Sequence, residues 1–317
     1  MHFTGIDWLR GVAAFFIVGC HIGLLDRTEG GFALTHFCDM NVGVFAAISG
    51  FLLQTSMIRA SGRDAIFVLK KRIRRLLPIY VGWSLFYLLA RWGLGLILGG
   101  SGLSQECKEG GPFWVWVVFG GGAACILWFI VNLLYVQTAI CLSCWKFPRL
   151  IDRPFVPIFF AIGFLAWAIV DSRYIGYYTA RLFAFVLLGW SIAVWYRKLP
   201  NGIGGWTACL AICLSAHFFL RGLVSAFALD FVCVIPILML AISRSAEKSS
   251  VVGNFLASTS MGVYLWHPFF VVGLQRTIVK YVSAPYSASI ILFAWIGTYA
   301  LALATTVLIG KRCQSIM

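Results

Sequence analysis

Long apolar stretches recur along this chain of 317 residues, and the first of them carries two polar side chains. Ile6 to Leu25 is long enough to cross a bilayer, yet it contains Arg10 and His21. At about 100° per residue, the 11 residues that separate them come within about 20° of three full turns. Both side chains therefore share one helix face, about 16 Å apart along the axis. Such a pair marks a functional site or is satisfied structurally by neighbouring helices.

The composition excludes a soluble globular protein. Hydrophobic residues make up 61% of the chain and charged residues only 11%, whereas a soluble domain carries about 25% charged residues. We therefore predict an all-α, polytopic membrane bundle that forms a single domain over residues 1–317. The net charge of +14 would suggest nucleic acid for a soluble protein, but membrane topology explains it here, so we expect no nucleic-acid partner.

Apolar windows of about 17 to 25 residues predict about ten transmembrane helices. If the N-terminus is cytoplasmic, 16 of the 25 Lys and Arg residues fall in inside loops and six in outside loops. This positive-inside bias places both termini in the cytoplasm. The predicted spans cover residues 6–25, 40–58, 77–98, 113–142, 155–171, 179–196, 205–222, 225–243, 254–274 and 287–309.

A basic segment follows the second predicted span. Ile66 to Leu77 reads IFVLKKRIRRLL, and a helix of this composition can anchor to lipid headgroups at the cytoplasmic interface. Alternatively it clamps a phosphate, because guanidinium groups bind phosphate oxygens bidentately and Arg72 and Arg75 share a helix face. We expect Pro78 to end or kink this helix. A clamp of this kind suits a nucleotide-containing donor such as coenzyme A.

The cysteines give little evidence for a metal site. Cys141 and Cys144 form a lone CxxC without the two further ligands that zinc needs, so we expect no metal. Cys38 and Cys107 fall in two loops that we predict to lie outside, where an oxidising compartment would allow a disulfide between them.

Five motifs occur in order over nearly the whole chain. They are the spacing of Arg10 and His21, the segment Val44–Leu53, the segment Arg72–Tyr80, the triplet Leu127–Phe129 and the segment Tyr264–Pro268. Together they resemble the R-x10-H, FF-x-x-SGF-L, RxxR, LWF and YL-x-HP motifs of the membrane acyltransferase 3 family. Ala46 and Ala47 depart from the second motif, and Asn132 and Gln137 stand in a region where some members carry a glutamate. Those members often have an extra hydrolase-like domain, so this chain is more similar to the short, stand-alone type.

The resemblance implies an O-acyltransferase of the bacterial inner membrane. Such an enzyme takes an acyl group, usually acetyl, from cytoplasmic acetyl-CoA and transfers it to a hydroxyl of a surface or lipid-linked glycan at the outer face. By match, His21 takes the position of the catalytic histidine, and Arg10, Arg72 and Arg75 take those of arginines needed for activity. Trp128 is a candidate wall of the acyl tunnel, or a packing or interfacial ring.

Acyl transfer requires a base for the acceptor hydroxyl, and imidazole is the usual base near neutral pH. We expect His21 to act as that base, with a covalent acyl-histidine as the less favoured variant. His267 is a candidate for acceptor binding, support of His21 or structural hydrogen bonding. Tyr264 and Asp39 are further candidates for contact with the acceptor, and Asp39 could instead cap a helix.

The rival function is transport. A polytopic bundle with buried Arg and His could carry or flip a glycan or a small anionic solute. However, the sequence has no visible inverted repeat and few acidic residues within its spans, both of which transporters commonly use.

Overall fold

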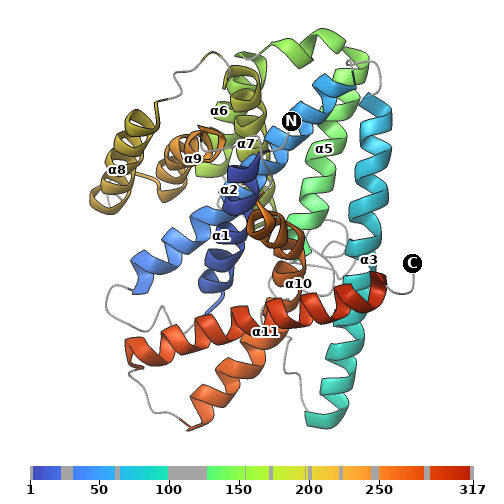
Figure 1. The fold of residues 1–317 in the computed structure, drawn as a ribbon, viewed down its shortest axis with the longest axis vertical. Coiled ribbons are helices and arrows are strands. Elements are labelled where there is room, and N and C mark those ends of the chain that lie inside the picture. The colour runs from blue at the N-terminus through green and yellow to red at the C-terminus, as the bar shows by residue number, and fades with distance from the viewer. Residues whose placement is uncertain are drawn as a thin grey trace. The chain divides into compact units, whose positions relative to one another are not determined.

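The computed structural model describes residues 3–22, 31–60, 65–98, 127–153, 155–170, 174–196, 198, 202–220, 224–243, 250–281 and 286–314. Within these ranges the chain forms ten α-helices, one short 3-10 helix and no strand, which confirms the all-α prediction (Figure 1). The elements are α1 (Thr4–Cys20), α2 (Gly31–Arg59), α3 (Ala65–Leu98), α5 (Trp128–Lys146), the 3-10 helix η4 (Pro148–Asp152), α6 (Phe155–Val170), α7 (Tyr174–Trp195), α8 (Ile203–Phe219), α9 (Ala226–Ser243), α10 (Val251–Tyr281) and α11 (Ala288–Gln314).

Helices dominate because the bilayer core offers no water to backbone N–H and C=O groups, which a helix satisfies internally. Of the described helices, five are long and apolar enough to cross a membrane, and they belong to α2, α5, α9, α10 and α11. Three shorter apolar helices lie in α6, α7 and α8. The count of ten spans and the cytoplasmic position of the termini remain predictions.

Some predicted boundaries differ from those of the structure. α1 ends at Cys20 instead of Leu25, because the N–H groups of His21 and Ile22 bond three residues back, to Val18 and Gly19, and tighten the last turn. The described part of the predicted outer loop that contains Cys38 is helical from Gly31 onward. α2 begins at Gly31, since the segment before the predicted span is mostly apolar and lacks proline.

The prediction that the basic helix could end at Pro78 is wrong. α3 continues through Pro78, so the basic segment and the predicted third span form a single helix. Proline removes only one backbone donor, and membrane helices tolerate that loss. Cys107 and the first part of the predicted fourth span lie outside the described residues.

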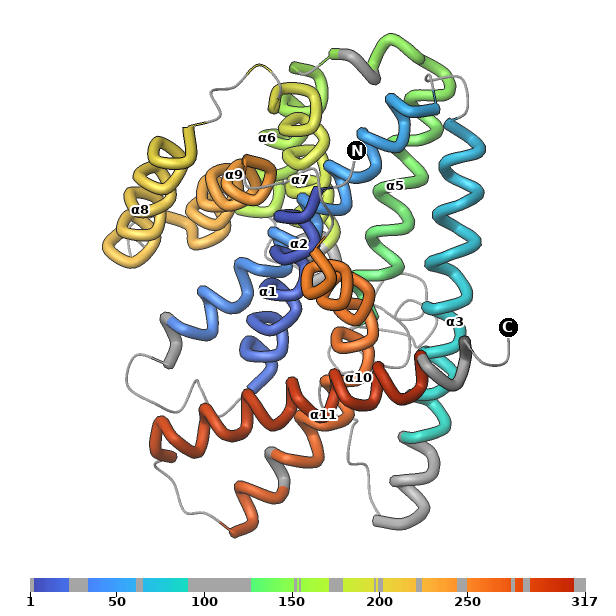
Figure 2. The backbone as a smooth tube through the Cα atoms, in the orientation of Figure 1, coloured from blue at the N-terminus to red at the C-terminus, as the bar shows by residue number. Residues whose placement is uncertain are grey.

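The chain divides into two compact units. Unit 1 comprises Met1–Ile48 and Lys198–Met317, and unit 2 comprises Ser49–Arg197. In unit 1, α1 packs against α9, α10 and α11, and α8 pairs with α9. In unit 2, α5 packs between α3 and α7, and α6 pairs with α7. Figure 2 follows α3 and α5 as neighbouring tubes.

Small residues allow close approach within unit 2. A Cβ at Gly50 of α2 would collide with the backbone carbonyl of Val186 in α7, so only glycine fits there. The glycine thus lets α2 and α7 approach closely at this point. A cavity of about 240 Å³ lies among α5, η4, α6 and α7, and no charged side chain lines it.

Candidate active site

His21 stands at the C-terminal end of α1. It is the first residue after the helix, with φ −94° and ψ −1°, and its side chain is half-buried. The tight last turn fixes its backbone, because the N–H of His21 donates to the carbonyl of Val18 at 3.2 Å. The imidazole thus projects from a helix end within unit 1, and its position depends on how α1 is packed.

Close packing in unit 1 holds α1 in place. A Cβ at Gly11 would come within 2.6 Å of the Leu256 side chain on α10, and one at Gly19 would collide with the ring of Trp295 on α11. The indole Nε1 of Trp295 donates to the carbonyl of Phe15 at 2.9 Å, and the two rings stack with centroids 5.0 Å apart. These contacts position the end of α1 that carries His21.

The structure brings His267 next to His21. The two ring centroids are 5.1 Å apart with a 31° angle between the planes. His267 lies on α10 and is fully buried. Its Nδ1 is 3.3 Å from the carbonyl oxygen of Val263. Since a carbonyl can only accept, Nδ1 carries the proton, and the neutral ring then presents Nε2 as an acceptor. Nε2 has no hydrogen-bond partner among the described residues.

Pro268 explains why the ring of His267 turns towards its own helix. Proline cannot donate to the carbonyl four residues earlier, which belongs to Tyr264. The His267 ring interacts with that carbonyl as well as with Val263. Tyr264 itself is buried, and its ring centroid lies 5.8 Å from that of His267. The backbone carbonyls of Val263 and Tyr264 thus orient the imidazole of His267.

Two further predicted residues belong to unit 1. Arg10 is half-buried on α1, eleven positions before His21. Asp39 is half-buried on α2. The ring contacts described above join His21, His267 and Tyr264, and they involve neither Arg10 nor Asp39.

The predicted donor residues belong to unit 2. Arg72 is half-buried on α3 and lies within electrostatic reach of the Cys141 thiol on α5. Arg75 is exposed, so the two arginines differ in environment although they share a helix face. Trp128 is buried at the start of α5, with its ring centroid 6.0 Å from that of Phe129.

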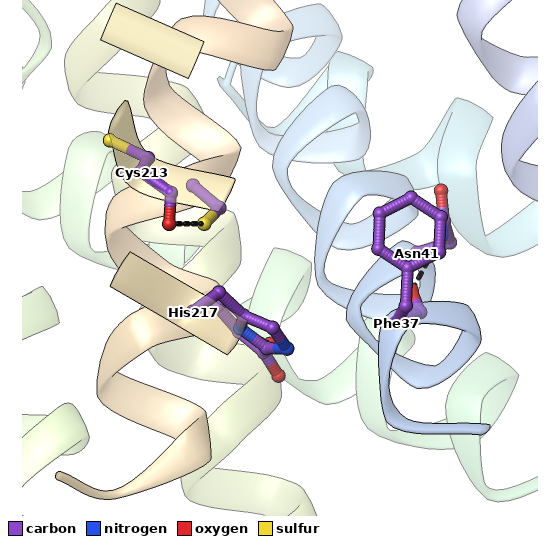
Figure 3. Close-up of polar contacts among 6 residues, drawn as sticks. Phe37, Asn41, Cys213 and His217 are labelled. Carbon is purple, nitrogen blue, oxygen red and sulfur yellow. Dashed lines mark hydrogen bonds and ion pairs between the residues drawn. The ribbon is translucent and has the colours of Figure 1, made fainter. Parts of the chain in front are cut away.

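A second buried polar pair joins α8 to α9. Nδ1 of His217 lies 3.5 Å from Oδ1 of Asp230, and both side chains are almost fully buried. One turn away, the Cys233 thiol donates to the carbonyl of Cys213 at 3.4 Å. Figure 3 shows Cys213 and His217 on successive turns of α8, beside the separate bond from Asn41 to Phe37. No motif in the sequence indicates this pairing, because it depends on how α8 packs against α9.

The comparisons with known proteins decide the family. A family model described as an acyltransferase domain matches residues 3–310. The chain belongs to the acyltransferase 3 family. No curated protein and no solved structure gives a match.

The family match shows that the chain is a membrane acyltransferase. The matched range, residues 3–310, contains every predicted site residue. Within the described ranges, no group of three His, Cys, Asp or Glu side chains could hold a metal ion.

Proposed function

We propose that this acyltransferase moves an acetyl group from cytoplasmic acetyl-CoA to a hydroxyl of a cell-surface or lipid-linked glycan at the outer side of a bacterial inner membrane. The observation that carries the proposal is the contact between His21 and His267, whose ring centroids are 5.1 Å apart. It joins two motifs from opposite ends of a chain that one acyltransferase model covers almost completely.

His21 acts as the general base. Its imidazole takes the proton of the acceptor hydroxyl, and the alkoxide oxygen attacks the thioester carbonyl. The tetrahedral oxyanion then collapses, an ester bond forms and the carbon–sulfur bond breaks. The coenzyme A thiolate leaves and recovers the proton from the imidazolium of His21. Protons balance in this sequence without a covalent acyl-histidine.

His267 binds the acceptor in this proposal. An unpaired acceptor nitrogen in a fully buried ring is costly unless a ligand or water pairs it. A glycan hydroxyl that donates to Nε2 of His267 would remove this cost and bring a neighbouring hydroxyl to His21. Tyr264 borders the same ring, and Asp39 supplies a carboxylate that can accept from further hydroxyls.

Arginines bind the donor. The phosphates of coenzyme A interact with Arg72 and Arg75, because guanidinium groups bind phosphate oxygens bidentately. The half-buried position of Arg72 favours a strong interaction, since partial burial reduces screening by water and salt. Arg10 supplies a further positive charge on the helix that carries His21, and Trp128 contributes an apolar wall for the arm of the donor.

The acceptor class is tested in cells. A deletion strain should lose a mass of one acetyl group from a surface glycan, and the wild-type gene should restore it. A His21→Ala gene should give normal amounts of membrane protein without restoring the mass. Restoration by His21→Ala, or a glycan profile unchanged by the deletion, would overturn the proposal.

A further inference from the structure

One buried amide in unit 2 has no hydrogen-bond partner within the part of the chain that the structure describes. The side chain of Gln137 on α5 is fully buried, and neither its Nε2 nor its Oε1 has a partner among the described residues. Leaving both atoms unpaired is costly, so such a group calls for a ligand or an ordered water. Asn132 on the same helix shows the ordinary case, since it donates to the carbonyl of Trp128 and accepts from Thr179, both at 2.9 Å.

The position of Gln137 links it to the predicted phosphate clamp. Gln137 and Cys141 are four residues apart, so they lie on the same side of α5, about 6 Å apart along the axis. Cys141 is within electrostatic reach of Arg72 on α3. Farther along the same pair of helices, Tyr135 interacts with Tyr80. The order of these two pairs along the chain indicates that the two helices run antiparallel. Gln137 lies between Tyr135 and Cys141 on α5, one turn from Cys141.

We propose that Gln137 binds an amide of the pantetheine arm of the acyl-CoA donor, with Nε2 donating to the amide carbonyl and Oε1 accepting from the amide N–H. This inference rests on the proposed donor. The arm carries two secondary amides between its phosphates and its sulfur, and each offers one donor and one acceptor. A carboxamide is complementary to such a group, whereas a phosphate, which only accepts, would leave Oε1 unpaired.

The arrangement also gives the donor a direction. With its phosphates on Arg72, the arm extends along α5 towards Gln137, away from the basic end of α3 that holds Lys70 and Lys71. Gln137 then binds the pantetheine arm and does not bind the nucleotide. Its contribution should vanish for a ligand that keeps the phosphates but lacks the arm.

The test uses the full chain in lipid nanodiscs with two probes, coenzyme A and adenosine 3′,5′-bisphosphate, which lacks the arm. Gln137→Leu should weaken coenzyme A binding by about 5- to 150-fold, the range for two lost hydrogen bonds, and leave binding of the bisphosphate unchanged. The same variant should melt at or above the wild-type temperature, because an apolar side chain replaces an unpaired amide. Asn132→Leu is the matched control, and it should lower the melting temperature through loss of its two bonds.

Several results would overturn the inference. If wild-type protein binds coenzyme A and Gln137→Leu binds it equally well, the assignment of Gln137 fails while the proposed donor stands. A lower melting temperature with unchanged affinity for coenzyme A would mean that the Gln137 amide binds a structural water instead of the donor. If Gln137→Leu weakens the binding of both probes equally, the residue does not bind the pantetheine arm specifically. If wild-type protein binds neither probe, the proposed donor fails and this inference fails with it.

Discussion

In the proposed mechanism the two nitrogens of His267 have different roles, and a pair of substitutions can distinguish them. Nδ1 bonds to the Val263 carbonyl within α10, while Nε2 has no partner among the described residues and lies on the ring that contacts His21. An asparagine places its amide near the position of Nδ1, and a glutamine places its amide near that of Nε2. His267→Asn therefore keeps the bond within the helix, whereas His267→Gln keeps a polar atom for the acceptor.

The expected magnitudes follow from these contacts. The bond from Nδ1 is long at 3.3 Å, so losing it in His267→Gln should cost about 0.5 to 1 kcal/mol of stability. A hydrogen bond that strengthens as charge develops is worth about 1.5 to 3 kcal/mol, so its loss in His267→Asn should lower kcat/KM by about 10- to 150-fold. We therefore expect wild type to be the most active, His267→Gln to be intermediate and His267→Asn to be the least active.

The assay measures acetyl transfer to membrane saccharide together with the melting temperature of each purified variant. An activity order with His267→Asn above His267→Gln would show that only the bond to Val263 matters. Wild-type activity in His267→Asn would remove Nε2 from the mechanism. Either result would refute the assignment of His267 to the acceptor.

Three further experiments test the packing and the proposed donor-binding residues. Trp295→Phe keeps a ring to stack on α1 but loses its N–H donor, so the free energy of unfolding should fall by about 1 kcal/mol, as a thermal melt would record. Arg72→Gln should raise the KM for acetyl-CoA more than Arg75→Gln does, because Arg75 is exposed and water and salt screen its charge; equal effects in steady-state kinetics would contradict this. Gly50→Val should destabilise the protein by about 1 to 3 kcal/mol through collision with a carbonyl of α7, whereas Gly82→Val on an open surface should not, and size-exclusion profiles of the two variants would show the difference.

The sequence predicts the helices well because the bilayer restricts what a membrane segment can form. The predicted span at 225–243 and the helix Ala226–Ser243 differ by one residue at one end. The end of α1 was not predictable from hydropathy, because the tight turn at His21 depends on backbone hydrogen bonds and not on apolar character. Of the two outcomes expected at Pro78, an end of the helix was wrong for a related reason, since a membrane helix can continue through the loss of one donor.

The candidate site was predictable residue by residue but not as an arrangement. Motif spacing indicated His21 and His267 separately, yet no pattern in the sequence says that α1 and α10 bring the two rings together. The sequence indicates Gln137 only as a departure from a glutamate. That its amide has no hydrogen-bond partner among the described residues depends on what packs around it. Tertiary packing decides both properties, and local sequence does not carry that information.

The central claim is that the imidazole of His21 removes the proton from the acceptor hydroxyl. Membranes from a deletion strain that expresses wild-type protein or His21→Ala are supplied with acetyl-CoA labelled in the acetyl group, and label in the saccharide fraction is measured. We predict clear incorporation with wild-type protein and a loss of at least about 100-fold with His21→Ala at equal protein level and equal coenzyme A affinity. Incorporation by His21→Ala at the wild-type rate would contradict the account.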